Sequence, residues 1–359
     1  MKLWRLVSCP INGVKVEYLS KLVFDDAFYQ TSIRLSSTAN PNNITEPFLN
    51  VLRVLLFHHG SIFNFTLHVP SLKSYSEVDL IIDYLSEKDV HEISFDFRYK
   101  GKNYEFSRLP SFLFSCVKLR RLTLSSCSLT VPFIFQGCVN LISLKLLHLS
   151  TVICDEHLYG CTTFEATKFF QSMPFIEHLR LGNEFMDIMP PRIMPRNFSL
   201  GYLRVLELPR IYCWCIDDIS AVLCLIVNSP NLKKLEIVFG STHDIERVEY
   251  LAEEILQVQD LLSNVLRKLQ VVKMKIGCTY AIKTKLYFIK FLLAESVELE
   301  KMFIQPPERT TAKERLRMLK KITRFPRASK KEEIMYLDPD DDDDDDDDID
   351  EFSSDESEG

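Results

Sequence analysis

The chain has 359 residues, 46% of them hydrophobic, which is enough to bury a sizeable core. Its net charge of −7 is unevenly distributed, because residues 338–359 hold 15 acidic side chains and no basic one, which leaves the rest at about +8. No apolar run resembles a secretory signal or approaches the roughly 18 residues of a membrane span, so we expect no membrane partner and a cytoplasmic or nuclear location.

The first 45 residues predict an incomplete start to the fold. Residues 22–26 form a short apolar segment that ends in two aspartates, and residues 36–45 are polar and rich in asparagine, which predicts a loop. We therefore assign residues 1–45 to a linker or to the remnant of a preceding module.

Helical and strand patterns alternate after this start. Apolar spacing predicts helices over residues 48–57 and 78–85, and alternation predicts strands over residues 63–69 and 93–97. A further helix is expected over residues 220–228, and the alternation continues to about residue 305.

A phrase of the form Leu-x-x-Leu-x-Leu, with apolar substitutes, recurs eight times. Successive copies lie 29, 22, 35, 27, 29, 37 and 30 residues apart, a loose period typical of leucine-rich repeats. The last two apolar positions of each copy share one face of a strand. We therefore predict an α/β fold: an irregular leucine-rich-repeat solenoid with parallel strands on the concave face and helices on the convex face. The copies begin at Val90, Leu119, Leu141, Ile176, Leu203, Leu232, Leu269 and Leu299.

We expect leucine-rich repeats over residues 46–268, a C-terminal cap over residues 269–337 and a disordered acidic tail over residues 338–359. A cap is needed because the last apolar face of a repeat array has no neighbour. In its basic segment we expect Leu316, Leu319 and Ile322 to pack, although docking of an acidic partner or nuclear import is an alternative role. Nine adjacent aspartates in the tail repel one another and bury nothing.

Residues between the apolar positions of each phrase project to the opposite, concave face. Several are basic and suit an acidic peptide or an anion, while the alternative is an ordinary solvated face, which Glu207 and Glu236 favour by interrupting the positive charge. Aromatic residues do not alternate with the basic ones, which disfavours nucleic acid as a partner. The candidate binding surface consists of Arg121, Lys145, His178, Arg180, Lys234, Lys273 and Lys301.

The sequence predicts no catalysis, metal or cofactor. It contains no glycine-rich phosphate loop, no G-x-S-x-G elbow and no H-E-x-x-H motif. Cys213 and Cys215, with Cys224 nearby, lack a second cysteine pair or a histidine pair, so we expect the cysteines to be reduced core residues. His58 and His59 are expected at a helix end or on the surface.

Several segments, in order along the chain, resemble those of plant F-box/FBD/LRR-repeat proteins. Residues 22–26 look like the stretch after the F-box, and residues 54–65 like the entry to the repeats. Residues 116–127 resemble the typical repeat of the family, and residues 269–304 resemble its FBD segment. Residues 324–329 resemble the segment with which sequences of the family usually end. The likeness covers roughly residues 20–337.

This resemblance implies the substrate-recognition subunit of an SCF-type ubiquitin ligase, which binds a protein substrate of unknown identity and catalyses nothing itself. The L-P-x-x-I-type module that docks a Skp-family adaptor is absent, so the adaptor is a partner only if an F-box lies upstream. Otherwise the chain is a short form that binds targets without the ligase. The contrast between the basic body and the acidic tail leaves a second functional class open. In that class the chain is an anion- or nucleic-acid-binding solenoid autoregulated by its acidic tail.

Overall fold

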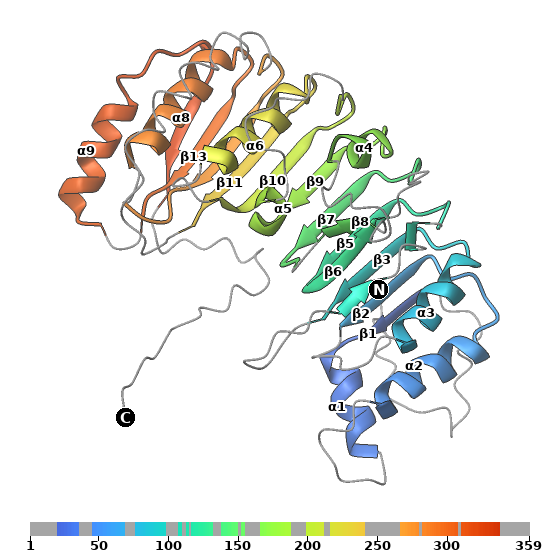
Figure 1. Ribbon diagram of the computed structural model, residues 1–359. Helices are drawn as coiled ribbons and strands as arrows, with labels where there is room; N and C mark the ends of the chain where they lie inside the picture. The colour runs from blue at the N-terminus through green and yellow to red at the C-terminus, as the bar shows by residue number, and fades with distance from the viewer. Residues whose placement is uncertain are drawn as a thin grey trace, which may run out of the picture.

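The structure of the chain is a computed structural model with a mixed α/β fold in which strands lie side by side along an arc (Figure 1). The α/β class predicted from the sequence is thereby confirmed. The residues that the structure describes are 20–35, 45–68, 76–97, 107–109, 113–114, 116–131, 138–149, 152–154, 166–187, 199–211, 216–240, 266–279, 282–307 and 310–337.

Eleven of the described strands form one sheet, and all of its neighbouring strands run parallel. Their order in the sheet is their order along the chain, so each strand pairs with the next one that joins this sheet. The strands are β1 (Lys21–Phe24), β2 (Asn64–His68), β3 (Glu92–Asp96), β5 (Arg121–Ser125), β7 (Ser143–Leu147), β9 (His178–Leu181), β10 (Val205–Ile211), β11 (Lys234–Phe239), β12 (Val271–Lys275), β13 (Lys301–Gln305) and β14 (Glu333–Tyr336).

The recurring phrase explains both the start and the burial of each strand. In two typical repeats the amide of its first apolar residue closes a tight turn, as where Leu119 donates to the carbonyl of Cys116 and Leu141 to that of Cys138. The two later apolar residues, such as Leu122 and Leu124, are then buried on one face of the strand. The parallel register places them beside their counterparts in the next repeat, so they build one continuous core.

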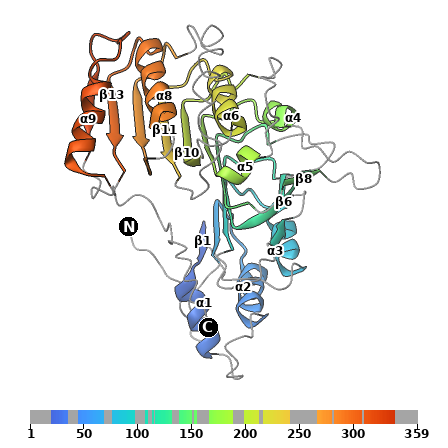
Figure 2. The ribbon, with the colours of Figure 1, turned by 60° about the vertical axis from the view of Figure 1, so that its left-hand side comes forward.

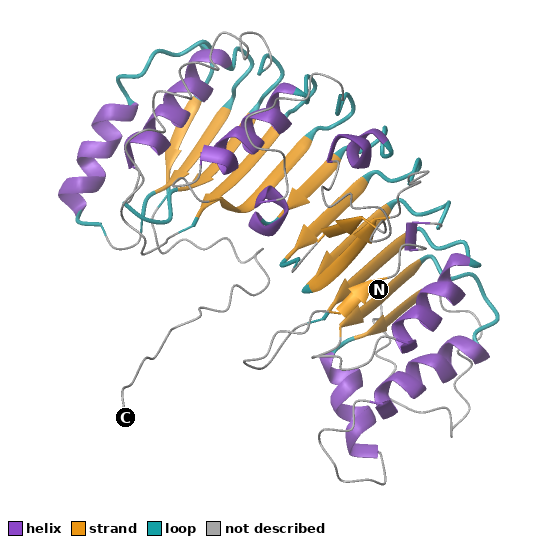
Figure 3. Ribbon diagram, in the orientation of Figure 1, coloured by secondary structure: helices purple, strands orange, loops and turns teal. Residues whose placement is uncertain are grey.

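The helices lie along the face of the sheet that carries the buried leucines (Figure 3). Helices over residues 48–57, 78–85 and 220–228 were predicted, and α2, α3 and α6 confirm them. Their bounds are α1 (Asp26–Leu35), α2 (Thr45–Phe57), α3 (Ser76–Ser86), α4 (Ala166–Gln171), α5 (Asn183–Asp187), α6 (Ile216–Val227), α8 (Ile282–Glu295) and α9 (Ala312–Ile322).

A second sheet of three short parallel strands was not expected from the sequence. It contains β4 (Ser107–Leu109), β6 (Cys127–Val131) and β8 (Val152–Cys154). Ser126 separates β5 from β6 and has a positive φ of 56°, a backbone conformation that few residues other than glycine adopt. That turn directs the chain out of the large sheet and into the small one.

The large sheet extends on both sides of the repeats that the phrase predicted. Residues 21–24, which we assigned to a linker or remnant, form β1 and pair with β2. The strand expected over residues 63–69 is β2, but Phe63 precedes it and is 42% exposed, while Phe65 and Leu67 face the core. At the other end β14 pairs with β13, so the sheet continues through the region that we expected to be a cap.

Helix α9 lies at the end of the sheet, beside β13 (Figure 2). A capping box fixes its start, since the Thr311 hydroxyl accepts from the Glu314 amide while Glu314 accepts from the Thr311 amide. The predicted packing stripe was wrong in part, because Leu316 is 51% exposed and Met318 is buried together with Ile322. The acidic tail lies outside the described residues.

Candidate binding surface

The surface opposite the helices, here called the polar face, is built by strand residues that alternate with the buried ones. The parallel register arranges them in two rows that cross the sheet, with neighbouring strands about 4.8 Å apart. The first row holds Arg121, Ser143, His178, Val205, Lys234, Val271 and Lys301, and the second holds Thr123, Lys145, Arg180, Glu207, Glu236, Lys273 and Phe303.

The seven residues predicted to form one basic stripe are therefore divided between these rows. The structure brings three of them together around Glu207 of β10. His178 Nε2 lies 3.1 Å from Glu207 Oε1, Arg180 Nη1 lies 3.5 Å from Oε2, and Lys234 Nζ lies 3.9 Å from Oε1. Glu236 adds a second carboxylate, 3.0 Å from Lys234 Nζ. We call these five residues the Glu207 network.

The Glu207 network holds a carboxylate whose side chain is only 14% exposed. Burial by itself would raise the pKa of Glu207, but contact with His178 and the charges of His178, Arg180 and Lys234 outweigh it and lower the pKa to about 2. Glu207 thus stays ionised at neutral pH and offsets positive charge in the middle of the polar face. Instead of a uniform cationic stripe, the centre of this face is a nearly balanced set of oriented ion pairs.

The remaining four candidates lie on either side of the network. Arg121 of β5 is exposed, and its Nη1 lies 3.6 Å from Glu92 Oε2, which also accepts from Asn64 Nδ2 at 2.6 Å. Lys145 of β7 neighbours Arg180 in the register.

Lys273 and Lys301 lie on the C-terminal side of the network, where half-buried apolar residues separate the charges. Val271 stands next to Lys301 in the first row, and Phe303 next to Lys273 in the second. This side therefore combines positive charge with apolar area, including the aromatic ring of Phe303, and aromatic residues are enriched in protein-binding surfaces.

Sequence reasoning treated Glu207 as an interruption of the basic stripe and missed its central position. The signal was present, because Arg180, Glu207 and Glu236 each occupy the same position in their copy of the phrase. Residues at equivalent positions become neighbours when parallel repeats stack in register. Aligning the copies position by position would have placed the carboxylate between the cations.

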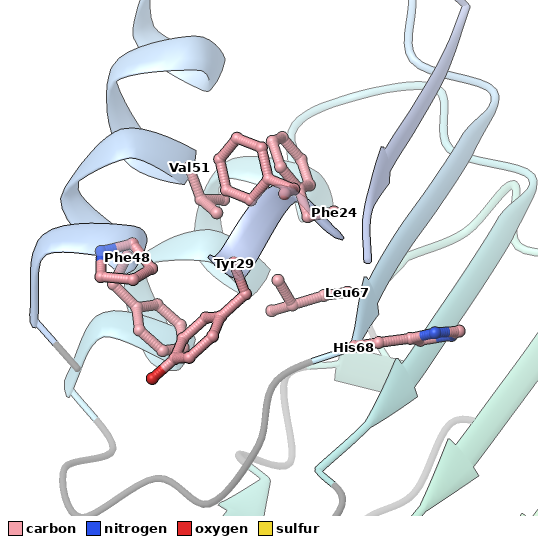
Figure 4. A pocket seen from close by; sticks show the side chains of 8 residues that line it. Phe24, Tyr29, Phe48, Val51, Leu67 and His68 are labelled. Carbon is pink, nitrogen blue, oxygen red and sulfur yellow. The ribbon is translucent and has the colours of Figure 1, made fainter. Parts of the chain in front are cut away.

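A small hollow lies between the N-terminal helices and the sheet (Figure 4). Its lining is mainly aromatic and aliphatic, and the ring of His68 points away from the aromatic cluster. His68 and Tyr29 are its only titratable lining residues, so we interpret the hollow as a packing gap beside the core. It is lined by Phe24, Phe28, Tyr29, Pro47, Phe48, Val51, Leu67 and His68.

Four of the five cysteines whose burial the structure describes support the prediction of core thiols, and Cys278 is only half-buried. Cys116, Cys127, Cys138 and Cys224 are buried and free. Burial raises the pKa of the Cys116 thiol to about 11 and that of Cys138 to about 12, which suppresses the reactive thiolate. Cys213 and Cys215 lie outside the described residues.

The other predictions about chemical sites concern metals and His58. Across the described ranges no group of three or more His, Cys, Asp and Glu side chains could hold a metal ion. His58 directly follows α2 and is 2% exposed, so the predicted helix-end position is confirmed, although the residue is buried.

The part of the chain that the structure describes contains no helix long and apolar enough to cross a membrane. In comparisons with known proteins, no family model matches the chain. A curated F-box/FBD/LRR-repeat protein of Arabidopsis thaliana is 24% identical over 391 aligned positions, which cover 89% of this chain and 89% of that relative. The likeness extends over most of both chains, and it confirms the resemblance to this plant family.

Proposed function

We propose that this chain, a relative of the plant F-box/FBD/LRR-repeat proteins, is a non-catalytic protein-binding scaffold. In this proposal the array of repeats is an irregular leucine-rich-repeat solenoid, the polar face is its concave side, and the helices form its convex side. The observation that best supports this proposal is the in-register sheet of eleven parallel strands, which presents side chains from many repeats at fixed spacings. Such a surface suits an extended protein segment better than a small molecule.

The chemistry of the polar face supports a protein as the ligand. Contacts with Glu207 hold His178, Arg180 and Lys234 in fixed orientations, which reduces the conformational entropy lost on binding. Beside them, Val271 and Phe303 offer apolar area. We place the main contacts on β9 to β13, with Arg121 and Lys145 extending the surface toward the N-terminal strands.

The family resemblance extends the proposal to a biological role. We assign the chain to substrate recognition in an SCF-type ubiquitin ligase, in the cytoplasm or the nucleus, with a protein substrate as partner. The competing role is that of a short form that binds the same targets without recruiting the ligase. Neither role requires a cofactor, and both use the same recognition surface.

A charge-reversal experiment tests the recognition surface. The variant Lys145→Glu/Lys301→Glu changes two positions of the polar face, and the matched control Lys283→Glu/Lys290→Glu changes two exposed positions of α8. Proteins cross-linked to each variant in plant cells would be quantified by mass spectrometry. A set of partners lost only from the polar-face variant supports the proposal. Equal recovery with both variants, both being folded by circular dichroism, contradicts it.

A binding assay with purified components separates the two roles. The chain would be mixed with a purified Skp-family adaptor and analysed by size-exclusion chromatography. Direct binding at micromolar concentration supports the ligase subunit and rules out the short form. Absence of binding, with partners still captured by the polar face, shows that residues 1–359 recognise targets without docking the adaptor themselves.

A further inference from the structure

Helix α9 carries five basic residues at helical spacing on one side. Lys313, Arg317, Lys320, Lys321 and Arg324 stand at positions i, i+4, i+7, i+8 and i+11, with Arg324 just beyond the end of the helix. Residues at this spacing line the same face of a helix. All five side chains are exposed. We call this set the cationic stripe.

The opposite side of α9 is held against the body of the protein. Met318 and Ile322 are buried there, and the hydroxyl of Tyr336 in β14 lies 3.7 Å from Met318 Sδ. After the helix, the amide of Ala328 donates to the carbonyl of Leu293 in α8. These contacts fix the rotation of α9, so the cationic stripe faces outward.

The charges of the cationic stripe are left largely unpaired by the residues that the structure describes. No ion pair within 4.0 Å involves any of its five members there. The one carboxylate on α9, Glu314, is engaged by the backbone and hydroxyl of Thr311, each at 2.9 Å, although Arg317 contributes to lowering its pKa. Four exposed positive charges on α9 and a fifth just after it suit a linear polyanion.

The chain itself supplies such a polyanion close to this site. Strand β14 ends at Tyr336, whose side chain contacts α9, and the nine aspartates of residues 340–348 begin four residues later. Four extended residues reach up to about 14 Å, and nine reach about 30 Å, whereas a helix of this length spans about 16 Å. The aspartate run is therefore long enough and close enough to lie along the whole stripe.

We propose that the aspartate run of residues 340–348 binds the cationic stripe of α9 in the same molecule and thereby excludes other polyanions from it. Single exposed ion pairs contribute little, but a short tether gives an effective concentration in the millimolar range. The contact is strong at low salt and weakens as salt screens the charges. The end of the repeat array would thus carry an anion site under intramolecular control.

Zero-length cross-linking tests where the aspartate run binds. A carbodiimide joins lysine amines only to carboxylates in direct contact. In the intact chain we expect tail peptides to be cross-linked mainly to Lys313, Lys320 and Lys321, and these links to disappear in 1 M NaCl. Links spread evenly over exposed lysines of the body, or no links to α9, would overturn the proposal.

A competition experiment tests the consequence. A fluorescent peptide of nine aspartates would be titrated into the full chain, into a chain with Asp340–Asp348 replaced by asparagine, and into two further variants of that neutral-tail chain. One variant replaces the five residues of the cationic stripe with glutamine. The matched control replaces five exposed basic residues near the other end of the sheet, namely Lys21, Arg34, Arg53, Lys118 and Arg120.

We expect the neutral-tail chain to bind the peptide on the order of tenfold more tightly than the full chain, as removal of a tethered competitor predicts. The stripe variant should lose this binding, and the control variant should keep it. Equal affinity of the full and neutral-tail chains would overturn intramolecular competition. Equal loss in the stripe and control variants would show general attraction to a basic body and would also contradict the proposal.

Discussion

The apolar core would be exposed at both ends of the large sheet, but a different kind of packing covers it at each end. At the N-terminal end, aromatic rings in edge-to-face and tilted contacts fill the core: Phe24 packs on Phe28 of α1 and on Phe65 of β2, which contacts Phe95 of β3. At the C-terminal end, β14 has one exposed residue and three half-buried ones, and α9 adds a narrow contact through Met318 and Ile322. The two ends of one parallel sheet are thus closed either by bulky aromatic packing or by a lightly packed helix with a capping box at its start.

The exposed surfaces of the two ends differ as well. Helix α2 leaves Leu56 and Phe57 exposed at 71% and 64%, whereas α9 exposes the cationic stripe. The end of α2 therefore exposes apolar side chains beside charged ones, whereas the exposed face of α9 is mainly cationic. The difference suggests that the ends meet different partners, and that stability depends more on the N-terminal packing than on α9.

The largest effect is expected from removing an aromatic ring at the N-terminal end. The variant Phe65→Ala leaves a cavity between Phe24 and Phe95 and should lower the free energy of unfolding by about 3–5 kcal/mol. Urea denaturation measures this change. The control Phe63→Ala removes an exposed ring that stacks on His91 and should cost about 1 kcal/mol or less. Similar losses in both variants would show that the aromatic core does not dominate this end.

At the C-terminal end, Ile322→Ala should destabilise the protein by about 2–4 kcal/mol, because this side chain is fully buried. Leu316→Ala, six residues earlier on α9, should change stability by about 0.5 kcal/mol or less, since Leu316 is half exposed. Hydrogen exchange of the α9 amides would follow both variants locally. A larger effect of Leu316→Ala would mean that α9 is rotated from the orientation described above.

Between the two ends, the Glu207 network predicts a dependence of stability on pH. The pKa of Glu207 is about 2 in the folded protein, below its ordinary value of 4.5. A carboxylate with a lowered pKa stabilises the fold above its unfolded pKa and loses this contribution as the pH falls toward the folded pKa. We expect ~1–3 kcal/mol to be lost between pH 5 and pH 2, measured by unfolding at each pH.

The variant Glu207→Gln isolates this contribution from that of the other carboxylates. It should be less stable than the wild type at pH 6, and the difference between the two proteins should shrink toward pH 2. A difference that stays constant over this range would show that Glu207 is not held ionised by its neighbours.

The smallest effect is expected at the start of α9. Thr311→Ala removes the capping hydroxyl and should cost about 1 kcal/mol, seen as earlier loss of α9 protection in hydrogen exchange. Thr323→Ala, at the other end of the helix, keeps the capping box and serves as the matched control. If the two variants behave alike, the capping box does not determine how firmly α9 is anchored.

Sequence patterns predicted the central strands because leucines at fixed spacing can be buried only by stacking copies of the same strand. These patterns predicted the strands at the two ends of the sheet less well, because other residue types replace leucine in the phrase there. Residues 62–67 carry Ile62, Phe65 and Leu67 in the same positions, but the aromatic ring obscured the match. Strand β14 places Ile334 and Tyr336 at the corresponding sites, and both are only half-buried, so its apolar signal is faint.

The candidate surface was predictable in composition but not in arrangement. Strand alternation correctly placed Arg180 and Lys234 opposite the core, yet their orientation depends on Glu207 in the strand between them. On α9, spacing alone allowed either Leu316 or Met318 to pack. Contact with Tyr336 and the neighbouring elements determines that Met318 is the buried one.

The unequal lengths of the strands have a consequence for how the protein forms. Strands β10 and β11 have seven and six residues, against four or five in the other strands of the large sheet, and α6 beside them is buried along most of its length. In a linear array, folding can start at any repeat and spread to its neighbours. The chain should therefore nucleate around β10, β11 and α6 and grow outward in both directions, with β1 and β14 the last strands to join and the first to fray.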